Sequence, residues 1–372
     1  MPNLNRTPLH GLHCELDARM VPFAGYEMPV QYYDGVLWEH LHTRTSAGLF
    51  DVSHMGQVRV SANSIKEAQL ALEALVPVSV LGIPEGRQRY GFFTSEAGGI
   101  LDDLMITNRG DELLLVVNAA TREQDVAHLS ANLAGCSVTS ITDRALLALQ
   151  GPGSEAALAA LVPGVGEMRC MDASVLDWNG IELWVSRSGY TGEDGYEISI
   201  PSSEVRAMAE ALLASDAVIP IGLGARDSLR LEAGLCLYGS DIDTTTTPVE
   251  AALEWAIQKA RRRGGERAGG FPGASRILEE LESGAPRRRV GFLPDGRAPV
   301  RAGVRIFREG SDDPVGEVTS GGFGPSLGRP VSMGYVKTEF SGTGTVLEAE
   351  VRSKRMPVTV ADMPFRPSTF KR

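Results

Sequence analysis

Cysteine is scarce in this chain of 372 residues, whose four cysteines are Cys14, Cys136, Cys170 and Cys236. They lie far apart, and no two of them form a Cys-x-x-Cys pair. Hydrophobic residues make up 43% of the chain, which is enough for a sizeable core without covalent cross-links. We therefore expect free thiols in a reducing compartment rather than a disulfide framework.

Positive charge and long apolar runs are also lacking. Lysine and arginine number 36 against 47 aspartates and glutamates, so the net charge is -11 and a nucleic-acid-binding protein is disfavoured. No apolar run is long enough to cross a bilayer, and the first ten residues hold no apolar signal core. The expected location is the cytoplasm, or the mitochondrial matrix if a presequence has been removed.

Signatures of several enzyme classes are absent. No His-Glu-x-x-His or other metal-ligand pattern occurs, and His40 and His42 stand too close together to share a helix face, so we expect no metal site. Neither a Gly-x-Ser-x-Gly elbow nor a P-loop is present. Residues 151–156 loosely match a dinucleotide fingerprint, but Pro152 removes an N–H that a phosphate would need. We interpret this segment as a tight turn with Ser154 as helix N-cap.

Hydrophobic periodicity predicts mixed helices and strands over the first three quarters of the chain. Helical spacing is found at 38–47, 64–75, 121–134, 154–161, 205–214, 225–232, 249–258 and 274–281. Strands are expected at 90–94, 104–107, 113–117 and 145–149, with a pair formed by 181–186 and 195–200. The irregular order of strands and helices indicates α+β layers rather than a regular parallel sheet.

The character of the sequence changes near residue 285, after a Ser-Gly-Ala-Pro break. Short β-like runs then alternate with glycine and proline, at 290–293, 304–307, 315–319, 331–336, 346–351 and 357–360. This pattern predicts a small antiparallel barrel or sandwich. We therefore place a domain boundary between residues 284 and 285. The segment Arg261–Gly270 has no apolar periodicity and is expected to be a mobile loop of undetermined role.

Three polar segments are candidates for chemistry. In GGILDDL, a strand would turn Asp102 and Asp103 to opposite faces, so that one carboxylate could face a cleft, although a solvated turn remains the plainer alternative. In GYTGEDGYE, three glycines permit a tight turn into a strand carrying Glu197, whose carboxylate could hold an amino-pyrimidine edge; an ordinary turn is the alternative. Arg226 and Arg230 share one helix face and need an anionic partner, from the protein or from a ligand.

The arginine triplets 261–263 and 287–289 could bind an anionic partner or simply face solvent. The second triplet lies at the domain boundary. It is expected to join the barrel to the body, or to receive an anionic ligand or an acidic partner protein.

Taken together, these segments resemble the glycine cleavage T-protein family. FAGYEMPVQY, FDVSHMG, GGILDDL, ALQGP, SGYTGEDGYE, ARDSLRLEAGLCLYGSDID, TPVEAAL, RRRVGF, VTSGGFGPSL and MGYV occur in that family's order over nearly the whole chain. The resemblance implies three domains in a ring around a central folate cavity. Residues 1–284 would form a folate-binding body of two interleaved α+β subdomains, and 285–372 the C-terminal β-barrel.

The implied activity is aminomethyl transfer from the lipoyl arm of the H protein to tetrahydrofolate, which releases ammonia and forms methylenetetrahydrofolate. Asp103 matches the family's essential acid, which would orient the folate nitrogens and stabilise the iminium-like carbon. The matching folate-site positions are Glu197, Arg226, Tyr90, Tyr190, Asn118 and Met55. Phe370 stands where the family commonly has a tyrosine, so we expect its stacking surface to be kept and a hydroxyl hydrogen bond lost.

Two other functions remain open under this resemblance. The same fold hosts folate-dependent demethylases of small methylated substrates. A non-catalytic folate-binding or Fe–S assembly protein is disfavoured, because such relatives usually carry a cysteine where this chain has Tyr190 and Thr191.

Overall fold

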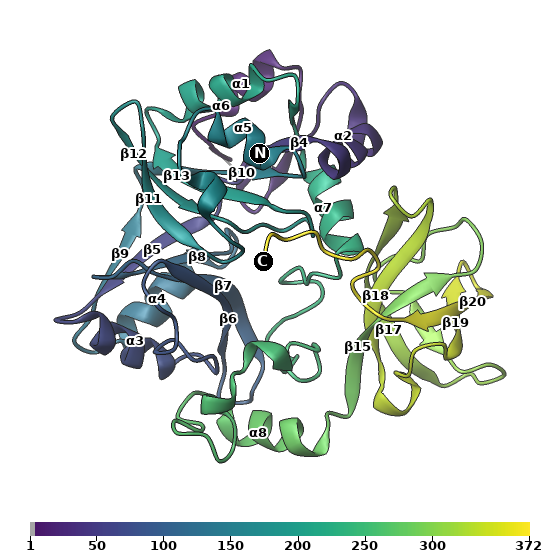
Figure 1. Ribbon diagram of the computed structural model, residues 1–372. Helices are drawn as coiled ribbons and strands as arrows, with labels where there is room; N and C mark the ends of the chain where they lie inside the picture. Colours follow the sequence, from purple (N-terminus) through teal and green to yellow (C-terminus); the bar gives the residue numbers. More distant parts are fainter. Residues whose placement is uncertain (1–3) are drawn as a thin grey trace.

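The computed structural model describes residues 4–372. Three bodies surround a common centre, and the C-terminal segment runs back through that centre (Figure 1). Two of the bodies are α+β layers, and the third is a closed antiparallel barrel. The α+β class and the C-terminal barrel expected from the sequence are confirmed.

The first body is built on a six-stranded sheet with the order β11-β12-β13-β10-β4-β14. Its strands are β4 (Ala47–Asp51), β10 (Arg144–Gln150), β11 (Ala173–Trp178), β12 (Ile181–Ser186), β13 (Gly195–Pro201) and β14 (Val218–Pro220). Around it lie α1 (His10–Glu15), α2 (Gly35–Thr45), α5 (Ser154–Ala159), α6 (Val205–Leu213) and α7 (Leu223–Glu232). The predicted pairing of 181–186 with 195–200 is confirmed by the antiparallel register of β12 and β13.

The second body carries a five-stranded sheet with the order β6-β7-β8-β5-β9, inserted between β4 and β10 of the first. Its elements are β5 (Gly56–Ser61), α3 (Ile65–Glu73), β6 (Arg87–Thr94), β7 (Ile100–Asn108), β8 (Leu113–Val117), α4 (Arg122–Asn132) and β9 (Ser137–Ile141). Ser64 caps α3 by accepting a hydrogen bond from the Glu67 N–H. A three-stranded sheet, β1 (Asn5–Arg6), β3 (Tyr26–Gln31) and β2 (Arg19–Phe23), completes the N-terminal part, and no sequence pattern predicted it.

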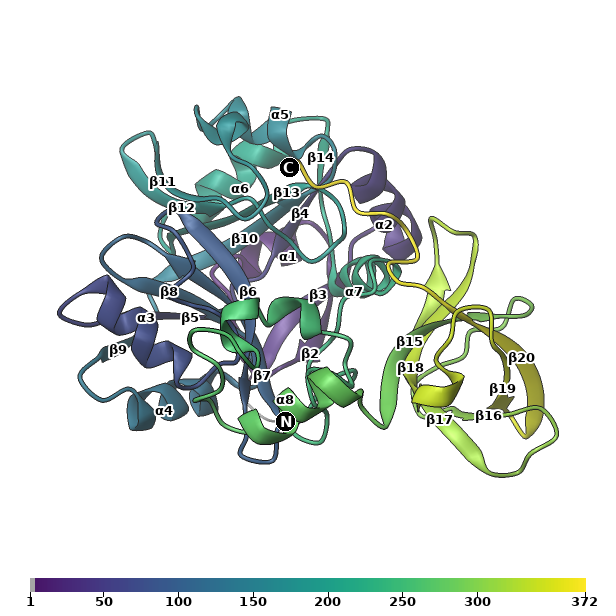
Figure 2. The same cartoon turned by 60° about the horizontal axis from the view of Figure 1, so that its bottom comes forward.

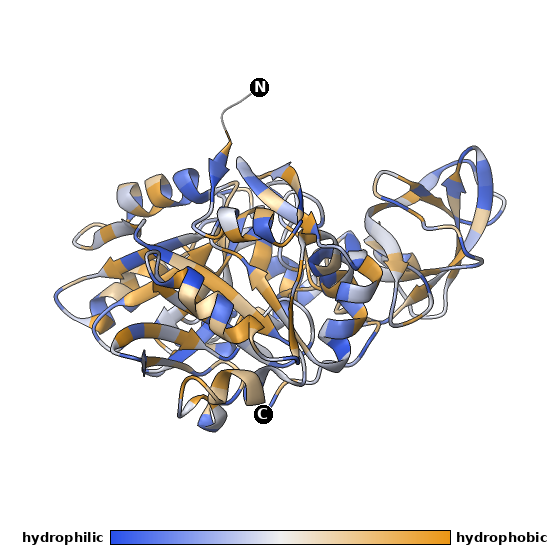
Figure 3. Ribbon diagram, turned by 90° about the horizontal axis from the view of Figure 1, so that it is seen from above, coloured by the Kyte–Doolittle hydropathy of each residue, from blue (hydrophilic) through white to orange (hydrophobic). Residues whose placement is uncertain are grey.

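The third body follows α8 (Ala274–Ser283) and is a closed six-stranded barrel (Figure 2). Its strands coincide with the six β-like runs: β15 (Arg287–Pro294), β16 (Arg305–Phe307), β17 (Pro314–Gly324), β18 (Arg329–Lys337), β19 (Val346–Val351) and β20 (Lys354–Ala361). Closure leaves no unpaired sheet edge. Hydrophobic residues predominate on the central strands of the two α+β bodies, whereas the barrel strands and the helices carry hydrophobic and hydrophilic residues together (Figure 3).

Two local predictions were wrong. Residues 249–258 form turns with a single 3-10 turn, η2 (Glu254–Ala256), in place of a helix, because Ala252 has a φ of 58°, which lies outside the right-handed helical region. At α5 the N-cap is Gly153, so Ser154 starts the helix and caps nothing.

The loop 261–270 contains no long regular element, as expected, but contacts hold it against the body. Arg261 is buried and donates to the Glu73 and Val76 carbonyls, while Arg267 bonds the Glu73 carboxylate. The expected mobility does not fit these contacts. Arg263 is the exposed member of its triplet and pairs with Glu282.

Candidate active site

The two adjacent carboxylates of β7 lie in different surroundings. Burial alternates along this strand, so that Asp102 is fully buried whereas Asp103 is half-buried. This is the alternation that a strand imposes on neighbouring residues. The amide Nδ2 of Asn118, which follows β8, donates to Oδ1 of Asp102 across 2.8 Å and to Oδ1 of Asp103 across 2.7 Å. One side chain therefore fixes both carboxylates.

Asp103 is held by a second donor from the neighbouring strand. The Tyr90 hydroxyl on β6 donates to its Oδ2 across 2.9 Å. Burial, and next the charge of Asp102, raise the pKa of Asp103 to about 7, although the hydrogen bonds from Tyr90 and Asn118 act in the other direction. At neutral pH the carboxyl can thus exchange its proton or carry a charge, as an acid–base or electrostatic catalyst must.

Aromatic rings enclose this carboxylate. Tyr90 stacks on Trp255, with ring centroids 5.6 Å apart and an interplanar angle of 21°. The Tyr190 hydroxyl donates to the Cys236 carbonyl, and burial raises the pKa of this hydroxyl, with a further contribution from the charge of Asp103. Trp255 is 62% exposed, so it forms the outer side of this aromatic wall.

The two arginines of α7 have different roles. Arg230 is buried and fully engaged, with partners Asp227, Asp241 and Ser320. The Arg226 guanidinium lies 4.8 Å from the Tyr190 ring centroid, and its Nη1 is a buried donor without a hydrogen-bond partner. The protein thus supplies the anion for Arg230, as the plainer alternative predicted, and leaves a free donor on Arg226.

Glu197 lies on β13 and interacts electrostatically with Arg226. Burial raises the pKa of its carboxyl, while the Arg226 charge lowers it in part. Its Oε2 accepts a hydrogen bond from the Ser188 hydroxyl across 3.2 Å. The half-buried Glu197 carboxylate and the half-buried Arg226 guanidinium are not joined to each other, so both are open to a polar ligand.

The glycines before Glu197 serve a different purpose from the one expected. Of the three, only Gly192 has a positive φ, 78°. A Cβ at Gly189 would lie 1.8 Å from the Gln150 side chain, and one at Gly195 would lie 2.4 Å from the Leu149 carbonyl. Close packing against β10, more than turn geometry, requires these two glycines.

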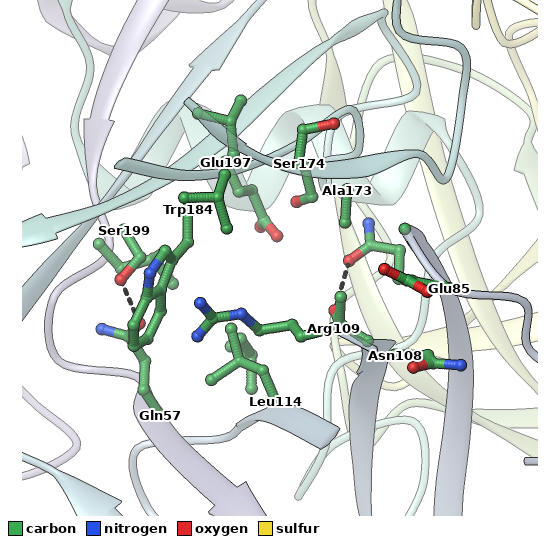
Figure 4. A pocket seen from close by; sticks show the side chains of 18 residues that line it. Gln57, Glu85, Asn108, Arg109, Leu114, Ala173, Ser174, Trp184, Glu197 and Ser199 are labelled. Carbon is green, nitrogen blue, oxygen red and sulfur yellow. Dashed lines mark hydrogen bonds between the residues drawn. The ribbon is translucent and has the colours of Figure 1, made fainter. Parts of the chain in front are cut away.

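A pocket of about 300 Å³ lies between the two α+β sheets, and Glu197 is one of its walls (Figure 4). Gln57, Leu114, Trp184 and Ser199 also line it. Asp103 is not among the lining residues. Glu197 therefore lines this pocket, and its charge also acts on Arg226.

The two remaining expected site residues are placed less directly. Met55 follows β4 and packs against the hydrophobic cluster that contains Phe50 and Ala225. Ala225 directly precedes Arg226 in the chain. Phe370 is half-buried in the C-terminal segment, where its neighbour Thr369 bonds the Glu193 carboxylate. The contacts described for Tyr90, Asp103 and Asn118 do not include Phe370.

The arginines 287–289 join the barrel to the body. Arg289 is buried and donates to the carbonyls of Ala251 and Gly234, each across 2.9 Å. Arg287 pairs with Glu250, and Arg288 with Glu254. Of the alternatives considered for this triplet, the structural one accounts for all three side chains.

Over residues 4–372, no group of three or more His, Cys, Asp or Glu side chains could hold a metal ion. In the same part of the chain, no helix has both the length and the apolar character needed to span a membrane.

The model of the GCVT N-terminal domain matches residues 9–261, and that of the glycine cleavage T-protein C-terminal barrel domain matches residues 287–366. The chain belongs to the glycine cleavage T-protein family. The mitochondrial aminomethyltransferase of Dictyostelium discoideum is 44% identical, with 99% of this chain and 94% of that protein covered. The human mitochondrial aminomethyltransferase is 43% identical, with 99% and 91% covered.

A solved structure agrees over the full length. The crystal structure of glycine cleavage system aminomethyltransferase T from Bartonella henselae has a TM-score of 0.93 and 42% identity, and all of both chains is covered. The Dictyostelium discoideum and human relatives are named as mitochondrial proteins, whereas the cytoplasmic location of this T-protein family member stays a prediction.

The sequence patterns did not identify two side chains near this T-protein site, Trp255 and Asp125. Trp255 lies in a segment that was predicted to be a helix, so its stacking on Tyr90 could not be predicted. Asp125, on α4, is 1% exposed, and burial, followed by the charge of Asp102, raises the pKa of its carboxyl to about 8. Its signal in the sequence was weak: an acidic residue in the first turn of a helix is ordinary, because it complements the helix dipole.

Proposed function

We propose that this protein is the aminomethyltransferase of the glycine cleavage system, with Asp103 at its reacting centre. The substrate is the aminomethyl group carried on the dihydrolipoyl arm of the H protein. The carbon–sulfur bond of this group breaks, its carbon bonds to tetrahydrofolate nitrogens, and ammonia leaves. The products are methylenetetrahydrofolate and the dihydrolipoyl arm. Full-length similarity to aminomethyltransferases supports the activity.

Asp103 is the group we assign to the transferred carbon. The Asp103 carboxylate is held in place by Tyr90 and Asn118. A fixed carboxylate in a poorly solvated site stabilises positive charge that develops on the reacting carbon without having to reorganise. With a pKa of about 7, the same group can hold or release a proton at a folate nitrogen.

We assign Glu197 and Arg226 to the pterin ring. A pterin presents an amino-pyrimidine edge with adjacent donors and a carbonyl acceptor. The half-buried Glu197 carboxylate can accept from the donors, and the unpartnered Nη1 of Arg226 can donate to the carbonyl. Tyr90, Tyr190, Asn118 and Met55 would line the remaining surface, with Phe370 nearby. These residues fit tetrahydrofolate because they offer both polar partners and aromatic walls.

The roles of the two parts of the chain follow from the arrangement of the three bodies. We propose that residues 1–284 form the folate-binding body and that 285–372 form a barrel that braces it. The body in turn contains two interleaved subdomains, since the second sheet is inserted between β4 and β10 of the first. Tetrahydrofolate and the lipoylated H protein are the partners under this proposal.

An assay with and without the H protein tests the proposal. Purified protein, tetrahydrofolate and aminomethylated H protein should yield methylenetetrahydrofolate and ammonia in equal amounts. The matched control is H protein that lacks its lipoyl group. If no folate product forms with the loaded H protein, the proposal is wrong. Methyl transfer from a small molecule without H protein would favour the demethylase, and folate binding without any transfer would favour a binding protein.

A further inference from the structure

The C-terminal residues of the chain cross from the barrel to the first body. They follow β20, and Figure 1 shows the end of the chain at the common centre of the three bodies. Phe365 packs against the hydrophobic cluster that contains Leu231 of α7. The backbone N–H of Arg366 then donates to the Glu232 carbonyl across 3.2 Å. Residues 368–372, which we call the C-terminal strap, therefore begin next to a fixed point at the junction of barrel and body.

Thr369 fastens this strap to the turn 189–194, which connects β12 to β13. The Thr369 hydroxyl donates to Oε2 of Glu193 across 2.6 Å and accepts a hydrogen bond from the Asp194 N–H across 3.1 Å. Its backbone N–H donates to the Gly192 carbonyl across 3.0 Å. One hydroxyl can fill both roles, because it has a proton to donate and lone pairs that accept. A single residue of the strap thus bonds three consecutive residues of the turn.

A second anchor lies further along the strap, at Lys371. The carbonyl of this residue accepts a hydrogen bond from the Cys170 N–H across 2.7 Å. Its ammonium group donates to Oε2 of Glu155 across 2.9 Å and to the Gly166 carbonyl across 2.6 Å. Phe370 is half-buried and lies between the two anchors in the chain. The strap therefore also restricts the ring that the sequence placed at the folate site.

The turn that the strap holds carries one wall of the proposed folate site. Tyr190 belongs to it, and its ring centroid lies 4.8 Å from the Arg226 guanidinium, whose Nη1 has no partner. Glu197 follows on β13, but the ladder that pairs this strand with β10 already begins at Gly195. We therefore expect the strap to act on the side of the site formed by Tyr190 and Arg226 more than on Glu197.

The turn is held by side chains rather than by regular structure, since residues 189–194 belong to neither strand. From the body, Arg44 of α2 donates to the Thr191 carbonyl across 2.6 Å and to Oε1 of Glu193 across 3.0 Å. Thr369 bonds the other carboxylate oxygen of Glu193, Oε2. Segments with few backbone ladder bonds open locally at a lower free energy than the core, so the loss of one holder should be measurable.

We propose that the C-terminal strap holds the turn 189–194 in the geometry that binds folate, and that Thr369 is the positioning residue that fastens it. A site whose walls are ordered before binding loses less entropy when the ligand binds, so its affinity is higher. The strap has no part in the bond-breaking step and acts on folate binding. Its link to folate rests on the proposed function, whereas the fastening of the turn does not.

Substitutions of Thr369 test this role with little disturbance of packing, because the residue is exposed. Thr369→Val keeps the shape of the side chain but can neither donate nor accept, whereas Thr369→Ser keeps the hydroxyl. A chain that ends at Pro367 lacks the strap altogether. The matched control is Thr343→Val, since the Thr343 hydroxyl is also exposed and donates to a carboxylate, that of Asp362, at the barrel.

Three quantities are measured for each variant: hydrogen exchange of the amides 189–194 without ligand, the tetrahydrofolate dissociation constant, and kcat and folate KM with loaded H protein. We expect Thr369→Val to speed exchange in the turn and to raise the dissociation constant and KM about threefold to tenfold, while kcat at saturating folate stays within about twofold. Thr369→Ser should behave as wild type, and so should Thr343→Val. The shortened chain should bind folate more weakly than Thr369→Val.

Unchanged exchange in the turn of Thr369→Val overturns the inference, as do equal losses of folate affinity in Thr369→Val and Thr369→Ser. Faster exchange with unchanged folate affinity would overturn the positioning role, and so would an equal loss of affinity in Thr343→Val. Because hydrogen exchange needs neither folate nor H protein, it tests the fastening of the turn even if the wild-type protein binds no folate. That last result would contradict the proposed function.

Discussion

The Tyr90 hydroxyl and the Asp103 carboxylate are joined by a hydrogen bond of 2.9 Å between neighbouring strands of one sheet. Tyr90 is in turn stacked on Trp255, whose ring is largely exposed. The bond thus connects the outer aromatic surface to the carboxylate that we place at the reacting carbon. It also lowers the pKa of Asp103, in opposition to burial.

Replacing Asp103 with asparagine should abolish turnover while folate binding is largely kept. The amide has nearly the same shape and can still accept one of the two hydrogen bonds, but it can neither carry the negative charge nor exchange a proton. We expect kcat to fall by about a thousandfold or more, as when a preorganised electrostatic group is lost. Single-turnover kinetics with loaded H protein, together with a folate titration, measures the two quantities. Full activity in this variant would rule out the role assigned to Asp103.

The pH dependence of wild-type activity should show an acid limb near pH 7. If the ionised form of Asp103 is the active one, kcat rises as the pH increases through its pKa of about 7. Tyr90→Phe removes a hydrogen bond that favours the ionised form, so the limb should move to higher pH. Tyr196→Phe is the control, because that hydroxyl donates to the Val165 carbonyl. A limb at the same pH in wild type and Tyr90→Phe would contradict this explanation.

Glu197→Gln should weaken folate binding more than it slows the chemical step. A glutamine offers one acceptor oxygen where the carboxylate offers two, and it leaves the Arg226 charge uncompensated. The loss of a charge-assisted hydrogen bond costs about 1.5–3 kcal/mol, so the folate dissociation constant should rise roughly tenfold to a hundredfold. Equilibrium titration gives this value, with exposed Glu309→Gln as the control. Unchanged affinity would remove Glu197 from the pterin site.

Arg289→Met should destabilise the protein without affecting H-protein recognition. The substitution leaves the buried carbonyls of Ala251 and Gly234 without their donor, which costs about 2–4 kcal/mol. Denaturant unfolding measures the loss, and exposed Arg308→Met provides the baseline. The H-protein KM should stay unchanged in folded enzyme. A raised KM at unchanged stability would instead make this residue part of a docking surface.

Elements with a strong local pattern could be predicted from the sequence. The six barrel strands and the amphipathic helix α3 were found because alternation and helical spacing report burial directly. The segment 249–258 was wrongly predicted, since its apolar residues have helical spacing but the positive φ of Ala252 prevents a helix. The N-terminal three-stranded sheet was also missed, because its strands pair with one another only through the tertiary fold.

The features of the site also divide into those that the sequence could predict and those that only the tertiary structure decided. The order of motifs along the chain determined the family, and strand alternation made it reasonable that Asp102 and Asp103 differ. Only the tertiary structure decided that Arg230 is neutralised by Asp241 while Arg226 keeps a free donor, because the distance between two charges depends on how distant segments pack. Local sequence thus specified the residues, whereas burial and long-range contact determined their charge.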